Sequence, residues 1–287
     1  MSVTANAEVV SAWDGPLYER CVRFRHVVTT GLATHGDVAL GRYPPRTGDR
    51  VLDVGCGFGD TTQAIAGLVG AGGEAVGADA APRFVDAARR EAAAAGVGNA
   101  RFVVADVQRD PIGGPYDQAF SRMGTMFFAN PVVALRHVRL ALRPGGRLVM
   151  VVWRRREDND WVYAAQRIVE RLIGRPDRYD EPTCGPGPFS MAGADTVSDV
   201  LLQAGFTDVA LHRHDAPILL GDDLDEAVDF VMALGPAGEL VRLWGDRMAH
   251  RHAEIRDALR AGLAQFAAAD DRVRAPASTW TVSARAA

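Results

Sequence analysis

The chain has 287 residues, of which 48% are hydrophobic and 24% charged, and its formal net charge is -4. Chains of this length bury roughly three quarters of their unfolded surface, as one large domain or two unequal ones. The composition excludes disordered, collagen-like and coiled-coil proteins. Because the isoelectric point is near 6.0 and no basic stripe occurs, the sequence disfavours a nucleic-acid binder and favours a small-molecule partner.

The first residues, MSVTANAEVVSAWDG, lack the basic and apolar regions of a secretory signal, and no apolar run of 18 residues occurs. We therefore expect a cytoplasmic protein without a membrane span. Cys21, Cys56 and Cys184 are odd in number and match no metal or disulfide spacing. We expect three free thiols and no metal site.

Short apolar runs alternate with stretches of helical period between residues 50 and 153. The runs predict strands, and the stretches 81–95 and 131–142 predict helices. Such alternation indicates a parallel sheet with helices on both faces. The predicted strands are 50–54, 74–78, 100–104, 118–120 and 147–152.

The alternation ends after Trp153. A charge-dense stretch follows at 154–160, and 174–193 contains four prolines and four glycines, which exclude regular structure there. We expect 154–193 to be a lid or insertion, in which 174–193 moves when substrate enters. Farther along, the pattern predicts a helix at 196–205, a strand near 208–214, helices over 221–269 and a last strand at 279–285.

The sequence VLDVGCGFGD at 51–60 is an apolar strand that runs into three alternating glycines. Glycines permit a sharp turn and the close approach of a ligand to the backbone, and Asp60 could cap a helix that starts near Thr61. This pattern alone is also that of an ordinary tight turn between a strand and a helix. Its spacing from other residues carries the functional argument.

Asp79 follows Gly55 by 24 residues, at the end of the next predicted strand, where a carboxylate can accept hydrogen bonds from two ribose hydroxyls. Asp106 ends the third strand. Either aspartate could instead be an ordinary helix N-cap. The dinucleotide fingerprint requires glycine at position 60, where Asp60 would repel a pyrophosphate. The pattern therefore favours a cofactor without phosphate.

These residues, together with VGADAAPRFVDAAR at 76–89, ADVQ at 105–108, YDQAFSRMGTMFFANP at 116–131 and LRPGGRLVMVVW at 142–153, resemble the class I S-adenosylmethionine-dependent methyltransferases. The similarity is to small-molecule enzymes related to the quinone-biosynthesis C-methyltransferases. It implies an α/β fold with a Rossmann-like, doubly wound, seven-stranded, mostly parallel sheet, an antiparallel last strand and a helical cap. The implied parts are an N-terminal cap segment 1–45, a cofactor-binding core 46–153 continued at 194–220 and 270–287, the lid 154–193 and a cap insertion 221–269.

The resemblance also implies roles for individual residues. Asp79 would hold the ribose diol of S-adenosylmethionine, and Asp106 would accept the adenine amino proton. Phe58 departs from the family, which often has a small hydroxyl residue at that position. The expected cofactor contacts are Asp53, Gly55, Cys56, Gly57, Asp79, Ala80, Phe84, Asp106, Val107 and Ser121.

The acceptor site is less defined by the sequence. Aromatic and thioether side chains of the cap could line an apolar pocket or simply pack in the core; the candidates are Tyr18, Phe127, Trp161, Phe189 and Met191. A base is required only if the acceptor must lose a proton, and the candidates are His26, His35 and His214. Each of these histidines could equally be structural.

Three functions remain open at this stage. The first is methyl transfer to an O, C or N atom of a small natural product or a quinone-like or isoprenoid metabolite. The second is an S-adenosylmethionine-binding protein that does not methylate. The third, an NAD-dependent oxidoreductase, is disfavoured by Asp60 and by the absence of any lysine. The sequence is compatible with a homodimer.

Overall fold

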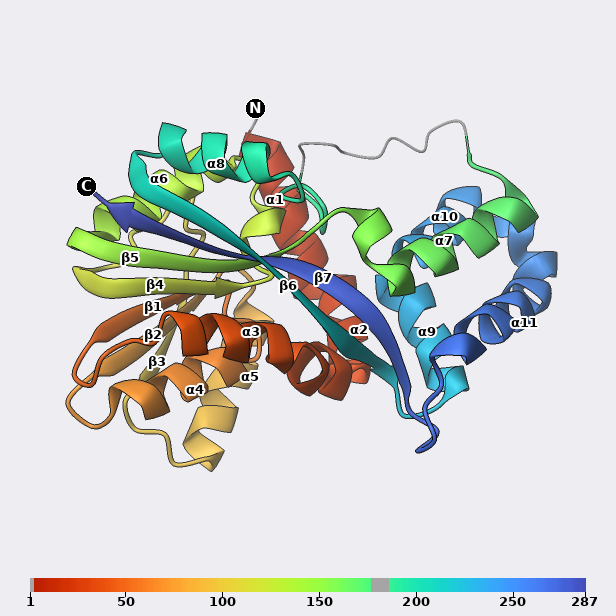
Figure 1. The fold of residues 1–287 in the computed structure, drawn as a ribbon, viewed down its shortest axis with the longest axis horizontal. Coiled ribbons are helices and arrows are strands. Elements are labelled where there is room, and N and C mark those ends of the chain that lie inside the picture. The colour runs from red at the N-terminus through yellow and green to blue at the C-terminus, as the bar shows by residue number, and fades with distance from the viewer. Residues whose placement is uncertain (1–2, 177–185) are drawn as a thin grey trace.

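A computed structural model describes residues 3–176 and 186–287. Its central feature is a seven-stranded sheet of order β3-β2-β1-β4-β5-β7-β6 (Figure 1). Strands β1 to β5 are parallel, whereas β7 is antiparallel to both β5 and β6. The predicted fold class is confirmed. The strands are β1 Arg50–Val54, β2 Glu74–Asp79, β3 Ala100–Val104, β4 Tyr116–Arg122, β5 Leu142–Trp153, β6 Phe206–Gly221 and β7 Val273–Ala286.

Helices cover both faces of the sheet because successive strand residues point to opposite faces. In β5, Val149 and Val151 pack in the cluster that contains residues of α3 and α4, whereas Leu148 and Met150 pack with residues of α6 and α8. Helices α3, α4 and α5 therefore lie on one face, and α6 and α8 lie on the other (Figure 1). These helices are α3 Leu32–Arg42, α4 Asp60–Val69, α5 Pro82–Ala94, α6 Pro131–Ala141 and α8 Ala194–Gln203.

Strands β6 and β7 form a hairpin that extends beyond the rest of the sheet. Their pairing runs from Phe206–Ala286 to Gly221–Val273, whereas β5 ends opposite Thr279. The strands predicted at 208–214 and 279–285 were too short. Pro217 and Pro276 face each other in the ladder, and in a sequence such prolines indicate strand ends. Both are accommodated here because each strand has one unpaired edge, where the missing N–H of proline is not needed.

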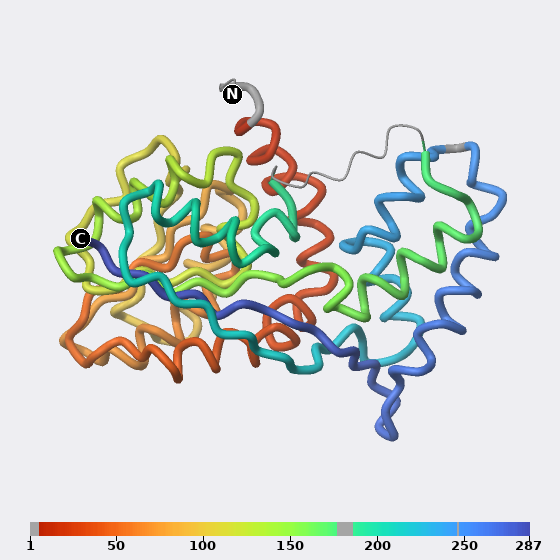
Figure 2. The backbone as a smooth tube through the Cα atoms, turned by 45° about the horizontal axis from the view of Figure 1, so that its top comes forward, coloured from red at the N-terminus to blue at the C-terminus, as the bar shows by residue number. Residues whose placement is uncertain are grey.

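Four helices form a bundle at the far end of this hairpin, which we call the cap bundle: α7 Asp160–Ile173, α9 Leu224–Leu234, α10 Pro236–Trp244 and α11 His252–Leu263. Helix α7 packs against α10 and α11, and α9 packs against both as well. The segment 154–193, expected as a lid, thus contributes a regular amphipathic helix to the bundle. Figure 2 shows the bundle beside the sheet, joined to it by the hairpin.

The N-terminal helices α1 (Val3–Ala12) and α2 (Tyr18–Arg23) stand between the carboxyl edge of the parallel strands and the cap bundle in both views (Figures 1 and 2). A kink at Gly15, which has non-helical backbone angles, separates α1 from α2, and a π-helical turn, Val27–Gly31, precedes α3. Across the described ranges, we find no helix with the length and apolar character needed to cross a membrane.

Candidate functional site

The turn after β1 requires its glycines. Gly55, Gly57 and Gly59 have φ angles of +70°, +52° and +79°, which favour glycine. A Cβ on Gly59 would lie 2.6 Å from the Phe102 ring, and one on Gly55 would lie 3.1 Å from the Cα of Gly124. The backbone of this glycine-rich turn therefore lies directly against the loop that follows β4.

Asp60 does not cap helix α4, contrary to the sequence prediction. The helix begins at Asp60 itself, with Gly59 at the N-cap position and no side-chain cap. The Asp60 carboxylate instead pairs with the Arg122 guanidinium of β4 at 2.6 Å. A hollow of about 270 Å³ lies beside this pair, between α3 and α4.

Asp79 links the ends of β1 and β2. Its carboxylate accepts hydrogen bonds from the backbone N–H groups of Gly57 and Ala81, each at 3.0 Å. The N-cap of α5 is Ala81, so Asp79 is not an ordinary helix cap. Burial raises the pKa of the Asp79 carboxyl above its usual value. Asp79 is thus held at the glycine-rich turn by the backbone on both sides of it.

Asp106 lies beyond the end of β3 and is also not a helix cap. One carboxylate oxygen accepts the backbone N–H of Gln108 at 3.0 Å, and the other accepts the side-chain amide of Asn6. Gln108 in turn accepts the backbone N–H of Asn130 at 2.6 Å. Helix α1 therefore covers the edge of the site that Asp106 forms.

Asp53 lies beneath the glycine-rich turn. Its carboxylate is buried and accepts a hydrogen bond from the Thr62 hydroxyl at 2.6 Å. Burial raises the pKa of Asp53 to about 7, because it disfavours the charged form. Nearby, the Ser121 hydroxyl donates to the carbonyl of Val54 at 2.7 Å and joins the ends of β1 and β4.

An aromatic cluster packs on the glycine-rich turn from the side of α2. The Phe58 ring lies 4.9 Å from the Phe84 ring and 6.0 Å from the Tyr18 ring. The Arg25 guanidinium lies 4.4 Å above Phe58 and pairs with Glu91. Phe58, which replaces the small hydroxyl residue common in the family, thus packs the glycine-rich turn against the N-terminal helices. Cys21 and Cys56 are buried free thiols.

The predicted pocket residues lie in two clusters that touch. Phe127, Trp161, Phe189 and Met191 belong to the main core cluster, and Tyr18 belongs to the aromatic cluster. Trp13 joins the two, because its ring lies 4.8 Å from the Phe127 ring and 6.2 Å from the Phe84 ring. Trp161 stacks on Phe230 of the cap bundle. Met191 is buried, and Phe189 lies below the Arg156 guanidinium. Cys184 and much of the proposed moving segment 174–193 lie outside the described residues.

The three candidate histidines occupy two places. His26 is half-buried and lies 3.3 Å from Glu226 and 3.8 Å from Asp222. His35 on α3 and His214 on β6 are neighbours, with ring centroids 5.1 Å apart. Neither grouping can be predicted from the sequence, because the partners come from distant elements.

Comparison with known proteins fits this geometry. A family model described as "Methyltransferase domain" matches residues 51–146. Nocamycin O-methyltransferase from Saccharothrix syringae is 34% identical over 176 residues, which cover 58% of this chain and 61% of that enzyme. The ubiquinone/menaquinone biosynthesis C-methyltransferase UbiE of Pseudomonas syringae pv. syringae is 27% identical over 61% of this chain and 71% of its own.

The chain is thus similar to class I S-adenosylmethionine-dependent methyltransferases, and its residues 51–146 match a methyltransferase domain.

Solved structures agree on the fold. YcgJ from Bacillus subtilis superimposes with a TM-score of 0.57 at 17% identity, over 88% of this chain and 98% of YcgJ. A putative methyltransferase of Haloferax volcanii, solved with the Trm112 activator, gives 0.52 at 21% identity, over 96% and 97% of the two chains.

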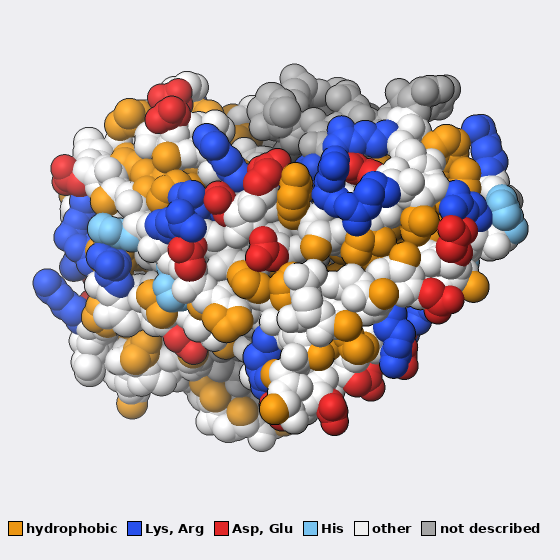
Figure 3. Space-filling model, turned by 45° about the vertical axis from the view of Figure 1, so that its right-hand side comes forward, with side chains coloured by type: hydrophobic (Ala, Val, Ile, Leu, Met, Phe, Trp, Pro, Cys, Tyr) orange, Lys and Arg blue, Asp and Glu red, His pale blue; other side chains and the backbone are white. Residues whose placement is uncertain are grey.

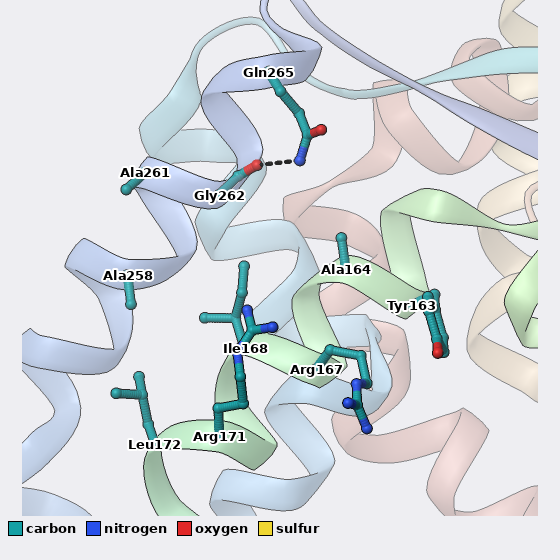
Figure 4. A pocket seen from close by; sticks show the side chains of 10 residues that line it. All are labelled: Tyr163, Ala164, Arg167, Ile168, Arg171, Leu172, Ala258, Ala261, Gly262 and Gln265. Carbon is teal, nitrogen blue, oxygen red and sulfur yellow. Dashed lines mark hydrogen bonds between the residues drawn. The ribbon is translucent and has the colours of Figure 1, made fainter.

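The protein also has an open groove on its cap bundle, with a volume of about 710 Å³ (Figure 4). It runs between α7 and α11, and none of its lining residues belongs to the glycine-rich turn. On the cap side, charged groups of both signs are interspersed with small hydrophobic patches (Figure 3). The lining residues are Tyr163, Ala164, Arg167, Ile168, Arg171, Leu172, Ala258, Ala261, Gly262 and Gln265.

Proposed function

We propose that this protein transfers a methyl group from S-adenosylmethionine to an O, C or N atom of a small organic molecule of the natural-product, quinone-like or isoprenoid type. The observation that carries the proposal is the Asp79 carboxylate, which is held against the backbone of the glycine-rich turn. A carboxylate at this place suits a ribose diol, because two hydroxyls can donate to its two oxygens.

The other residues complete a cofactor site in this proposal. Gly55 and Gly57 leave room for the methionine moiety, with Asp53 beneath them. Ala80 and Phe84 border the adenine, and Asp106 accepts its amino proton. Asn6 now occupies one oxygen of Asp106, so the α1 helix would exchange this bond for one to the adenine.

The bound cofactor supplies a methyl group already activated on a sulfonium. The protein then contributes mainly by holding the acceptor atom in line with this methyl group, an effect worth on the order of 7–11 kcal/mol in favourable cases. The N-terminal helices and the cap bundle stand over the carboxyl edge of the sheet. In the proposal they exclude water and select the acceptor. The relatives are named for O-methylation and C-methylation.

The proposal is tested by calorimetry and by methyl transfer. Titration in the presence of a chelator should show binding of S-adenosylmethionine and S-adenosylhomocysteine without metal. Incubation with cofactor labelled in its methyl group should then label phenolic or quinol acceptors. Binding of NADH in place of S-adenosylmethionine would contradict the proposal, and cofactor binding without label transfer to any acceptor would favour a protein that does not methylate.

A further inference from the structure

The groove on the cap bundle lies between two antiparallel helices, α7 and α11 (Figure 4). Near the end of α7, the carbonyl of Leu172 accepts a hydrogen bond from Arg251, which precedes α11. One turn earlier in α7, Ile168 meets Gly262 near the end of α11, because a Cβ there would lie 2.2 Å from the Ile168 side chain. The floor of the groove is therefore the direct contact between the two helices.

Small side chains keep the groove open along α11. The residues that α11 contributes are Ala258, Ala261 and Gly262, and Gln265 follows them at the end of the groove. Helices pack with their axes about 8–10 Å apart, and small side chains at the contact favour the shorter distances. A groove of about 710 Å³ between two helices thus has the shape to receive a third helix.

The exposed face of α7 carries an unpaired charge at each end. Asp160, Arg167 and Arg171 are exposed on this face. Arg167 lies 3.6 Å from Glu170, whereas neither Asp160 nor Arg171 forms an ion pair within the described ranges. The two are the first and twelfth residues of α7, about 16 Å apart along the helix axis, too far to pair with each other.

The signs of these two charges also suit the dipole of α7. Asp160 lies in the first turn and Arg171 in the last turn, where an acid and a base respectively stabilise a helix. This effect involves one copy of the helix only. Pairing between two copies differs from it in what a reversal of both charges does.

We propose that a second copy of this chain docks in the groove, with the two α7 helices antiparallel about a two-fold axis near residues 165 and 166. The axis places Asp160 of one copy opposite Arg171 of the other, and the same pair forms again at the opposite end. Tyr163 of each copy then lies opposite Ile168 of the other. A face with one unpaired acid and one unpaired base at equal distances from its centre complements itself, so a copy of the same helix fits it.

The proposed interface is separate from the glycine-rich turn, which contributes none of the residues that line the groove. Each copy in the dimer therefore keeps its own Asp79 site at the sheet, and the inference does not depend on the proposed function. Exposed ion pairs are weak and are screened by salt. We expect a reversible dimer that weakens as the salt concentration rises.

Analytical ultracentrifugation of the full chain measures this equilibrium. The parent protein should be a monomer at about 1 µM and mainly a dimer at about 200 µM in low salt, as expected for a small interface. A parent protein that stays a monomer at the higher concentration would overturn the inference. Binding of dodecyl sulfate in the groove of such a monomer would assign the groove to an anionic small ligand instead.

Charge reversal identifies the two residues that pair. Asp160→Arg or Arg171→Asp alone places like charges opposite each other at both ends, so each should raise the dimer Kd by about 10-fold or more. An equimolar mixture of these two variants should form a heterodimer with a Kd like that of the parent, because opposite charges then meet at both ends. The double variant Asp160→Arg/Arg171→Asp should also dimerise like the parent, although its charges oppose the helix dipole.

Two further variants separate the groove from general effects of charge and folding. Arg90→Asp is the matched control, because Arg90 is an exposed arginine of α5 with no ion pair in the described part of the chain; it should leave the Kd unchanged. Ala261→Trp fills the groove from an exposed position without changing charge, and it should abolish the dimer while a thermal melt shows an intact fold.

The outcome of the mixing experiment decides between the interface and its alternatives. Single variants that dimerise like the parent, or a mixture of them that remains monomeric, would overturn the pairing of Asp160 with Arg171. Calorimetry with S-adenosylmethionine should give the same affinity for the parent and Asp160→Arg. Absence of cofactor binding in both would contradict the proposed function and leave the dimer interface unaffected.

Discussion

Asp53 and His35 are buried ionisable groups with opposite effects on the pH dependence of stability. Burial raises the pKa of Asp53 from its ordinary 3.8 to about 7 and lowers that of His35 from 6.5 to about 4. Between pH 4 and 6.5, unfolding releases a proton from Asp53 and adds one to His35. As pH rises through this window, Asp53 makes the fold less stable and His35 makes it more stable.

In the parent protein, the effects of Asp53 and His35 on how the free energy of unfolding changes with pH cancel. We therefore expect single substitutions to reveal each effect. Asp53→Asn removes the proton release, so its free energy of unfolding should rise between pH 4.5 and 6.5 relative to the parent. His35→Gln should show the reverse. Each difference should amount to about 2 kcal/mol, because a full proton difference changes stability by about 1.4 kcal/mol per pH unit.

Urea unfolding of the ligand-free proteins at the two pH values measures these slopes. The other titrating groups are common to all three proteins, so their contribution to the pH dependence cancels when each variant is compared with the parent. If both variants kept the slope of the parent, Asp53 and His35 would titrate alike in the folded and unfolded chains.

The ribose contact makes a separate prediction for Asp79. Asp79→Ala should weaken S-adenosylmethionine binding by about 1.5–3 kcal/mol, since the diol would lose charge-assisted hydrogen bonds. Asp271→Ala is the control, because Asp271 is exposed. Calorimetry measures both affinities, with a thermal melt to confirm folding. Parent-like affinity in Asp79→Ala would show that the ribose is held elsewhere.

At the level of elements, the sequence was most informative in the core. The strands predicted at 50–54 and 100–104 match β1 and β3, because each is a short, mainly apolar run bounded by turn residues. The lengths of β6 and β7 were underestimated because the outer half of their hairpin lacks such an apolar run and contains two prolines. Helix α7 was missed because a charge-dense stretch precedes it and a Pro/Gly-rich stretch follows it.

For the site, the sequence indicated Asp79 and Asp106 through their positions after strands. It gave no indication of Asn6, Arg122 or Thr279, whose partners are 62 to 244 residues away in the chain. Side chains on one strand edge can be predicted from spacing, whereas contacts between the N-terminal helices and the sheet depend on how these elements pack. The roles of the candidate site residues remain predictions.

The junction of α9 and α10 depends on a close contact at Gly238. A Cβ at this position would lie 1.7 Å from the carbonyl oxygen of Met232, a backbone atom that cannot rotate away. Gly238→Ala should therefore lower the free energy of unfolding by about 3 kcal/mol, at the upper end of overpacking effects.

Gly67→Ala, on an open position of α4 with no heavy atom within 4 Å of the added Cβ, is the matched control. It should stabilise the protein by up to about 1 kcal/mol through helix propensity. Urea unfolding compares the two variants. Equal effects would show that α9 and α10 are not in close contact at Gly238.

At the level of the whole molecule, His26 joins the N-terminal helices to the cap bundle. Its ring, Asp222 and Glu226 place their ligand atoms within 4.8 Å of one another, the spacing of a possible metal site. Both carboxylates already have partners: Asp222 pairs with Arg272 at 3.0 Å, and Glu226 accepts the backbone N–H of Asp222 at 2.7 Å.

We therefore expect the protein to need no metal. Its thermal midpoint should change by less than about 1 °C on treatment with EDTA or on addition of Mg²⁺, Mn²⁺ or Zn²⁺, because a ligand that binds only the folded state would raise it. The His26→Ala variant should respond in the same way. A rise of several degrees in the parent protein but not in His26→Ala would identify a metal site.

The paired ends of the β6–β7 hairpin have a consequence for how such proteins diversify. Gly221 and Val273 lie opposite each other, so residues 222–272 leave the sheet and return to it at one point. The exposed turns of a segment anchored in this way can change in length while the register of the two strands is kept by their own ladder. Related proteins with the same sheet can thus differ in the helices inserted at this position while the glycine-rich turn and its aspartates stay in place.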